Sequence, residues 1–162
     1  MGIQLNAGCA TLLKIGTGSS DALEELGYSI DGFNLEERVF KEDIHSDENG
    51  GTAGPPVDIM IHGQIDVITF DAVRIDPIVA AKVQFVKGTS AGVVPSSCVL
   101  LFGDSKSYRV LLIGTNFTRN YLRVVISQKN LGRIGAHASV FRYTLECHMD
   151  PTARVLWNTT TA

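Results

Sequence analysis

Hydrophobic and polar residues alternate with a period of two along most of the chain, a pattern typical of half-buried β-strands. It is clearest over residues 57–73, where apolar side chains occupy the odd positions from 57 to 67 except for Gly63. A glycine inside such a strand indicates a β-bulge or a close approach of another backbone. At Ile68 and Phe70 the apolar side chains move to even positions, which predicts a second bulge.

The same alternation predicts further strands at residues 11–15, 33–44, 98–102, 108–113, 121–127, 138–147 and 155–157. Two segments depart from it. Residues 21–26, followed by Gly27, predict one helical turn. Asp76 before Pro77 combines an N-cap residue with a proline at the first helical position, which predicts a short helix over 76–83.

Many short strands with one polar side predict a mainly β fold, with about seven or eight antiparallel strands in a β-sandwich or a squashed barrel. The short helix flanks the strands, a long inter-strand loop covers 45–56, and residues 158–162 form a polar tail. The chain has 162 residues, no internal repeat and no linker-like segment. We therefore expect a single domain over 1–162.

The net charge of −3 hides an uneven distribution along the chain. Residues 1–81 carry 4 basic and 14 acidic side chains, and residues 82–162 carry 10 basic and 3 acidic ones. Either the subunit presents opposed surfaces that dock on neighbouring copies, or strands from both halves interleave and the charges mix. Nucleic-acid binding by the basic half is a weaker interpretation, because few aromatic side chains lie nearby to stack on bases.

No stretch of the sequence matches a known catalytic or ligand-binding motif. The glycines after residue 15 lack the Lys and the Ser or Thr of a phosphate-binding loop. Aligning Gly50 with the invariant glycine of an EF-hand places His45 and Pro56 where the two end ligands belong. An irregular cation site would use Asp43, Asp47 and Glu48. We expect no catalytic, metal or cofactor site, although sequence alone does not test a catalytic pair assembled from distant residues.

The cysteines and the first residues bear on the cellular compartment. Cys9, Cys98 and Cys147 lack metal-ligand spacing, and their odd number argues against a disulfide framework, so we expect a reducing environment. The chain start lacks the basic and apolar regions of a secretory signal. No apolar run approaches the ~18 residues that span a bilayer, so we expect no membrane partner.

Three stretches together carry a resemblance to a known family. Residues 42–77 (EDIHSDENGGTAGPPVDIMIHGQIDVITFDAVRIDP) pass from an acidic strand end through a Gly-rich loop and a two-faced strand to an Asp-Pro helix start. Near the start, a Gly-Cys-Ala-Thr-Leu strand meets a glycine turn and then LGYSIDGFNLEE, and the end reads FRYTLECHMDPTARVLW. This layout covers nearly the whole chain and resembles the major tail tube proteins of tailed bacteriophages.

The resemblance implies two antiparallel sheets flanked by a helix, and subunits that stack as rings, commonly hexamers, whose pooled strands line a channel for DNA and ejected proteins. The helix would be 76–83, the loop 45–56 would reach an adjacent ring, and strands 33–44 and 57–73 would line the channel. Acidic walls suit such a channel, because Lys and Arg contacts to phosphate give non-specific DNA affinity. The implied lining residues are Glu36, Glu37, Asp58 and Asp66, whereas Arg38 departs from the acidic pattern.

Ring stacking needs two different complementary surfaces on each subunit. Charge alone suggests that the acidic loop of one copy meets basic residues of the next. The residues expected at this interface are Asp43, Asp47, Glu48, Asn49, Arg119, Lys129 and Arg133. The resemblance also implies other virion partners (a baseplate or tip protein, a terminator protein, a sheath), transient passage of DNA without specific binding, and a place in the virion after assembly in the host bacterial cytoplasm.

Two other classes of protein compete with this interpretation. Capsid cement or decoration proteins and head–tail connector or terminator proteins also use small β-sandwiches with symmetric contacts. A small-molecule-binding β-barrel or an enzyme is a more remote alternative. We expect a self-assembling structural protein and not an enzyme.

Overall fold

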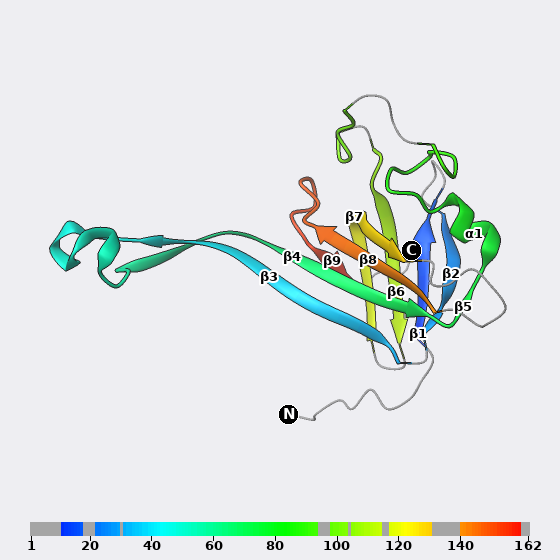
Figure 1. Cartoon of the computed structure of the whole chain (residues 1–162), viewed down its shortest axis with the longest axis horizontal. Helices are drawn as coiled ribbons and strands as arrows, with labels where there is room; N and C mark the ends of the chain where they lie inside the picture. Colours follow the sequence, from blue (N-terminus) through cyan, green and yellow to red (C-terminus); the bar gives the residue numbers. More distant parts are fainter. Residues whose placement is uncertain are drawn as a thin grey trace.

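The computed structural model describes residues 11–17, 22–29, 31–93, 98–103, 105–114, 117–130 and 140–159. Within these residues nine antiparallel strands form one sheet, and one short helix, α1 (Pro77–Lys82), lies beside it (Figure 1). The strands are β1 (Thr11–Gly16), β2 (Leu23–Ser29), β3 (Phe33–Ile44), β4 (Asp58–Ala72), β5 (Arg74–Ile75), β6 (Tyr108–Gly114), β7 (Phe117–Asn130), β8 (Phe141–His148) and β9 (Trp157–Asn158). The predicted mainly β, antiparallel fold is confirmed.

The sheet folds over itself around one hydrophobic core. The strand order is β3-β4-β8-β7-β6-β1-β2-β5, and β9 pairs with β7. Because the end strands β3 and β5 do not pair with each other, the sheet is open and the squashed barrel does not form. Figure 1 shows β4 and β8 running across β1, β2 and β6, as in a sandwich. The largest buried side chains of the core are Leu13, Ile15, Leu26, Ile68, Phe70, Tyr108, Leu112, Tyr121, Ile126, Tyr143 and Leu145.

The helix forms where its capping signal predicts it. The Asp76 carboxylate accepts hydrogen bonds from the backbone N–H groups of Ile78 (2.8 Å) and Val79 (3.2 Å), which satisfies two donors of the first turn. Val79 packs its side chain into the core. In the described part of the chain, no helix has the length and apolar character needed to cross a membrane.

The helical turn predicted at residues 21–26 is wrong. Residue 21 lies outside the described residues, Ala22 has no regular secondary structure, and residues 23–26 belong to β2, which pairs with β1. The pairing register shifts between Leu13 and Lys14, which leaves Leu26 as the extra residue of a bulge. This bulge breaks the two-residue alternation, so the strand cannot be recognised from its pattern.

The strand predicted at residues 98–102 is also wrong, because residues 98–100 have no regular secondary structure and residues 101–103 form a turn. The Leu101 carbonyl accepts a hydrogen bond from the backbone N–H of Lys106 (2.7 Å), and the Leu100 side chain is exposed. An apolar run becomes a strand only where a neighbouring strand can pair with it. Of the strand predicted at 138–147, residues 138 and 139 lie outside the described residues, Val140 has no regular secondary structure, and residues 141–147 belong to β8.

The bulge predicted at Gly63 is confirmed. Phe40 pairs with Gly63, whereas Lys41 pairs with Ile61, so His62 is the extra residue on β4. The bulge reverses which face of the sheet the odd-numbered residues of β4 occupy.

The second bulge, predicted near Ile68 and Phe70, does not exist. The register between β4 and β8 runs without interruption from Asp66 to Ala72. Ile65 and Val67 lie on one face of β4, and Ile68 and Phe70 lie on the other. The apolar residues change from odd to even positions because both faces of the strand carry apolar side chains.

Strands β3 and β4 extend far beyond the rest of the sheet (Figure 1, cyan to green). β8 pairs with β4 only over Asp66–Ala72, so residues 38–65 form a two-stranded hairpin. We call residues 38–65 the arm and the remainder of the described chain the body. Two turns of 3-10 helix, η1 (Asp47–Asn49) and η2 (Gly51–Ala53), form the tip of the arm within the predicted loop 45–56.

Candidate interaction site

The arm has no hydrophobic core of its own in the described structure. It consists of two strands, and an isolated two-stranded hairpin is marginally stable in water. β3 is the end strand of the sheet, and β4 has no neighbour other than β3 along the arm, in so far as the structure describes the chain. Both strands therefore present an edge of backbone hydrogen-bonding groups, which is a template for pairing with another strand.

Large apolar side chains are exposed along the arm, which is unusual for a surface hairpin. These residues are Val39, Phe40, Ile44, Val57, Ile59, Met60 and Ile61. Ile61 is the most exposed of them, at 70%. The arm of the isolated subunit therefore exposes apolar side chains to water.

The exposed apolar residues occupy both faces of the arm. Directly paired residues of an antiparallel sheet share a face, and residues alternate between faces along a strand. By this rule, the face that continues the core surface of the body carries Val39, Ile59 and Ile61. The opposite face carries Phe40, Ile44 and Met60. A partner that covers only one face therefore leaves the other in water.

The outer part of the arm is also acidic. Residues 42–65 contain five carboxylates and none of the 14 Lys and Arg residues of the chain. With Arg38 and Lys41 at its base, the whole arm carries a net charge of −3, and the rest of the chain is neutral overall. Asp47 and Glu48 are exposed at the tip. Glu42 lies 2.8 Å from Nε2 of His62 across the hairpin. An apolar arm with an acidic end fits a surface that combines apolar contacts with positive charge.

Glycines give the tip its tight shape. Gly50 and Gly51 have φ angles of 90° and 61°, in the left-handed region that favours glycine. The backbone N–H of Gly51 donates to the Ser46 carbonyl (3.1 Å), and the N–H of Val57 donates to the Ile44 carbonyl (2.8 Å). The predicted loop 45–56 is thus a hydrogen-bonded turn at the end of the hairpin.

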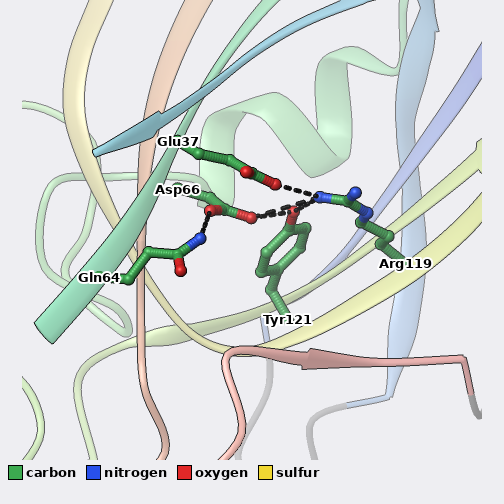
Figure 2. A network of polar contacts seen from close by, with 5 residues as sticks. All are labelled: Glu37, Gln64, Asp66, Arg119 and Tyr121. Atoms are coloured by element: carbon green, nitrogen blue, oxygen red, sulfur yellow. Dashed lines mark hydrogen bonds and ion pairs between the residues drawn. The ribbon is translucent and has the colours of Figure 1, made fainter. Parts of the chain in front are cut away.

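A buried polar network lies where the arm joins the body (Figure 2). The Asp66 carboxylate is fully buried and accepts a hydrogen bond from the Tyr121 hydroxyl (2.8 Å). It also lies 3.4 Å from Nη1 of Arg119 and accepts from the side-chain amide of Gln64 at 3.4 Å. Nη1 of Arg119 lies 3.7 Å from the Glu37 carboxylate, which pairs across the hairpin from Asp66. Three strands thus meet in one set of polar contacts.

Burial keeps the tyrosine of this network protonated. It raises the pKa of Tyr121 well above its usual range, Arg119 opposes this shift, and the neighbouring Asp66 carboxylate adds to it. Burial likewise raises the pKa of Cys147, which pairs with Asp66 across β4 and β8. The Tyr121 hydroxyl therefore keeps its proton at pH values at which a free tyrosine begins to ionise, and it donates to Asp66, while the Cys147 thiol is a buried apolar group.

One of the four residues predicted to line a channel, Asp66, does not lie at the surface. Glu36, Glu37 and Asp58 are exposed, as expected for such residues, but Asp66 is fully buried and faces the core. Asp66 lies on the same face of β4 as the core residues Ile68 and Phe70, because all three occupy even positions. This shared face was the signal in the sequence that Asp66 is buried. A carboxylate in phase with core residues indicates a buried group that needs partners.

The predicted stacking residues separate into two groups. Asp43, Asp47 and Glu48 are exposed on the outer arm. The basic residues are engaged inside the subunit: Arg119 contacts Asp66 and Glu37, and Nζ of Lys129 donates to the carbonyl of Val83 (2.8 Å) at the end of α1. Arg133 and the side chain of Asn49 lie outside the part that the structure describes. The body therefore uses the two described cations of this set, Arg119 and Lys129, for its own contacts.

The uneven charge of the two halves is partly neutralised within the fold. Glu24 pairs with Lys82 at 2.7 Å. Arg142 contacts Asp71 through two hydrogen bonds of 2.6 Å and 2.7 Å, which holds the pKa of Asp71 below its usual value. Each of these pairs joins the acidic half to the basic half. The interpretation in which strands from the two halves interleave and their charges mix thus holds for the body, whereas the outer arm keeps its negative charge.

Little in the described residues resembles an enzymatic centre. They contain no group of three or more His, Cys, Asp or Glu side chains arranged to hold a metal ion. A surface depression of about 700 Å³ is open to solvent. Its charged lining residues, Glu24 and Lys82, are paired with each other.

Comparison with models of known protein families and with curated proteins finds no match to this chain. The arm and its junction with the body are therefore interpreted from their own geometry.

Proposed function

We propose that the protein is a structural subunit that assembles with copies of itself into stacked rings, forming the tube of a phage tail through which DNA passes. The arm is the observation that carries this proposal. Its apolar residues lie on both faces, and both of its strand edges are open along the described hairpin. Burying these surfaces against neighbouring copies gains hydrophobic free energy and completes the backbone hydrogen bonds.

A second copy of the chain fits the arm better than an unrelated partner. The outer arm is acidic, and Arg38 and Lys41 place two basic side chains at the base of the same arm, so one subunit supplies charges of both signs. The two ends of the sheet also differ, because one is the long strand β3 and the other is the two-residue strand β5. Different surfaces on one subunit give heterologous contacts, which close into rings or extend into filaments.

The proposed tube needs no reaction from its subunits. In the assembly, the exposed residues Glu36 and Asp58, which share one face of the hairpin, would face the channel, where negative charge keeps DNA from binding, whereas Glu37 lies on the opposite face. The rings would be hexamers, as is common in the family that the sequence resembles. Contacts at the two ends of the tube would involve other virion proteins.

The experiment compares two arm variants with a matched control from the body. Purified protein at high concentration and low salt is examined by negative-stain electron microscopy and analytical ultracentrifugation. Wild-type protein is expected to form rings or tubes. Ile61→Lys and Met60→Lys change one apolar residue on each face of the arm, and each is expected to leave folded single subunits.

The control is Ile78→Lys, because Ile78 in α1 is as exposed as Ile61, at 70%. It adds the same charge to the same residue type, outside the arm, and is expected to assemble. Circular dichroism checks that all three variants fold. Assembly of both arm variants like wild type, or a wild-type protein that stays monomeric under these conditions, would refute the proposal.

A further inference from the structure

We propose that Asp66, Tyr121 and Arg119 fix the direction in which the arm leaves the body. Their contacts join β4 to β7 at the point where the sheet narrows to two strands. The inference concerns the arm of the single subunit, and only its consequence for assembly rests on the proposed function.

Asp66 stands at the boundary between arm and body. On β4 it pairs with Glu37 of β3 on one side and with Cys147 of β8 on the other. The Asp66–Cys147 pair is the last between β4 and β8, and beyond it β4 pairs only with β3. A two-stranded hairpin twists and bends more easily than a sheet that is supported on both sides. The direction of the arm is therefore set by what holds its base.

The contacts at the base come from β7, a strand that does not pair with β4. Tyr121 is fully buried, and its hydroxyl donates to Asp66 at 2.8 Å. Nη1 of Arg119 contacts carboxylates of β3 and β4 directly beside the arm, Asp66 at 3.4 Å and Glu37 at 3.7 Å. The arginine is held in turn by its neighbours, because its guanidinium lies 4.4 Å from the centre of the Trp157 ring.

A buried carboxylate makes these contacts directional. Burying a charge is costly unless it is paired and hydrogen-bonded, and an apolar residue at the same place commonly gives equal or greater stability. Groups of this kind can instead select one conformation among several. Rotating the arm together with the adjoining Glu37–Asp66 pair away from β7 would strip Asp66 of the Tyr121 hydroxyl and leave a buried charge without its shortest hydrogen bond. One arm direction satisfies the carboxylate, and other directions do not.

Single-molecule energy transfer at picomolar concentration measures this direction without any assembly. Dyes are attached to Thr52→Cys at the arm tip and to Ile78→Cys in α1, in a chain whose Cys9 and Cys98 are changed to Ser. The otherwise unchanged chain is expected to give one narrow distribution of transfer efficiency. Asp66→Asn and Tyr121→Phe are each expected to broaden it or to add a second population, and the double variant is expected to do no more than either alone.

Tyr108→Phe is the matched control. Tyr108 is a buried core tyrosine whose hydroxyl donates to the Gln84 carbonyl at 2.9 Å, away from the arm. It should lower the stability of the body and leave the distribution narrow, which separates positioning of the arm from general stability. If Asp66→Asn fails to fold, Tyr121→Phe still decides, because it removes a single oxygen atom.

A narrow, unchanged distribution in Tyr121→Phe overturns the inference, and so does equal broadening in Tyr108→Phe. Neither result bears on the tail tube proposal, which is tested by assembly of the surface variants. If both proposals hold, Asp66→Asn and Tyr121→Phe should each assemble more slowly than wild type, although both variants keep every apolar side chain of the arm.

Discussion

Ile68 and Ile61 lie on the same strand, β4, and on the same face of the sheet, yet Ile68 is fully buried and Ile61 is 70% exposed. The two residues are equally apolar, and the alternating pattern around them is similar. The difference lies in what surrounds each one. Ile68 is in the body, where the sheet folds over and supplies a facing layer, and Ile61 is in the arm, where the described chain provides none.

The comparison shows that the pattern of a strand encodes a buried face but does not say which molecule buries it. The body satisfies its own pattern, so its stability belongs to the subunit. The arm carries the same kind of pattern on both faces without a covering layer in the described chain, and the proposed assembly would supply that layer. Matched substitutions in the two regions can test this division.

The largest difference is expected for Ile68→Ala compared with Ile61→Ala. Ile68→Ala removes fully buried methyl groups and leaves a cavity, which should lower the free energy of unfolding by about 2–5 kcal/mol. Ile61→Ala removes an exposed side chain and should change it by less than about 0.5 kcal/mol. Urea denaturation at concentrations below the onset of assembly measures both values. Similar losses for the two variants would show that the arm is buried within the single subunit.

The sequence predicts the elements that depend on local signals. The bounds of β3 follow from its pattern, α1 follows from the Asp76 cap, and the bulge near Gly63 follows from a glycine within a strand. It does not predict β2, because the bulge at Leu26 hides the alternation. The apolar run at 98–102 shows the opposite failure, since its pattern is that of a strand but no strand pairs with it.

The candidate site was predicted only in part. Acidic residues in the loop 45–56 are a local feature, and the structure places them at an exposed tip. The network around Asp66 joins β4 to β7, and residues 66 and 121 are far apart in the chain. No local pattern reports such a contact. The sequence shows only that Asp66 and Ile68 lie on the same face of β4. This indicates that Asp66 is buried but does not identify Tyr121 or Arg119 as its partners.

A smaller difference is expected for glycine substitutions in the two regions. At Gly27 of β2, an added Cβ would lie 2.4 Å from the backbone carbonyl oxygen of Arg74, so the backbone must shift. Gly27→Ala should therefore lower the free energy of unfolding by about 1–3 kcal/mol. At Gly63 in the arm, nothing described lies within 4 Å of an added Cβ, and Gly63→Ala should change it by less than about 0.5 kcal/mol.

Urea denaturation of the two glycine variants measures this difference. The control is Gly27→Ser, which adds a Cβ at the same place and should be at least as destabilising as Gly27→Ala. If Gly63→Ala proves the more damaging variant, the arm must be packed against something within the subunit, and the division between arm and body would fail.

The smallest difference is expected for Asp150→Asn in the body compared with Asp47→Asn at the arm tip. Asp150 follows β8 and accepts hydrogen bonds from the backbone N–H groups of Thr152 and Ala153 (2.8 Å each) and from Nε of Arg123 (3.0 Å). The Ala153 N–H, the Thr152 N–H and the Arg123 side chain hold the pKa of Asp150 below its usual value. Asp150→Asn should lower the free energy of unfolding by about 1–2 kcal/mol near neutral pH, whereas Asp47→Asn should be close to neutral.

The pH dependence gives this last prediction its sign. Because the pKa of Asp150 is lower in the folded chain than the value of about 3.9 in the unfolded chain, its carboxylate stabilises the fold above that pH. The stabilisation is lost as the pH falls from about 4 through the folded pKa. The gap between wild type and Asp150→Asn should therefore be widest near neutral pH and should narrow in acid, as measured by urea denaturation at several pH values. A gap that widens in acid would mean that the variant acts by disturbing the turn, and that the carboxylate charge contributes nothing to the stability of the body.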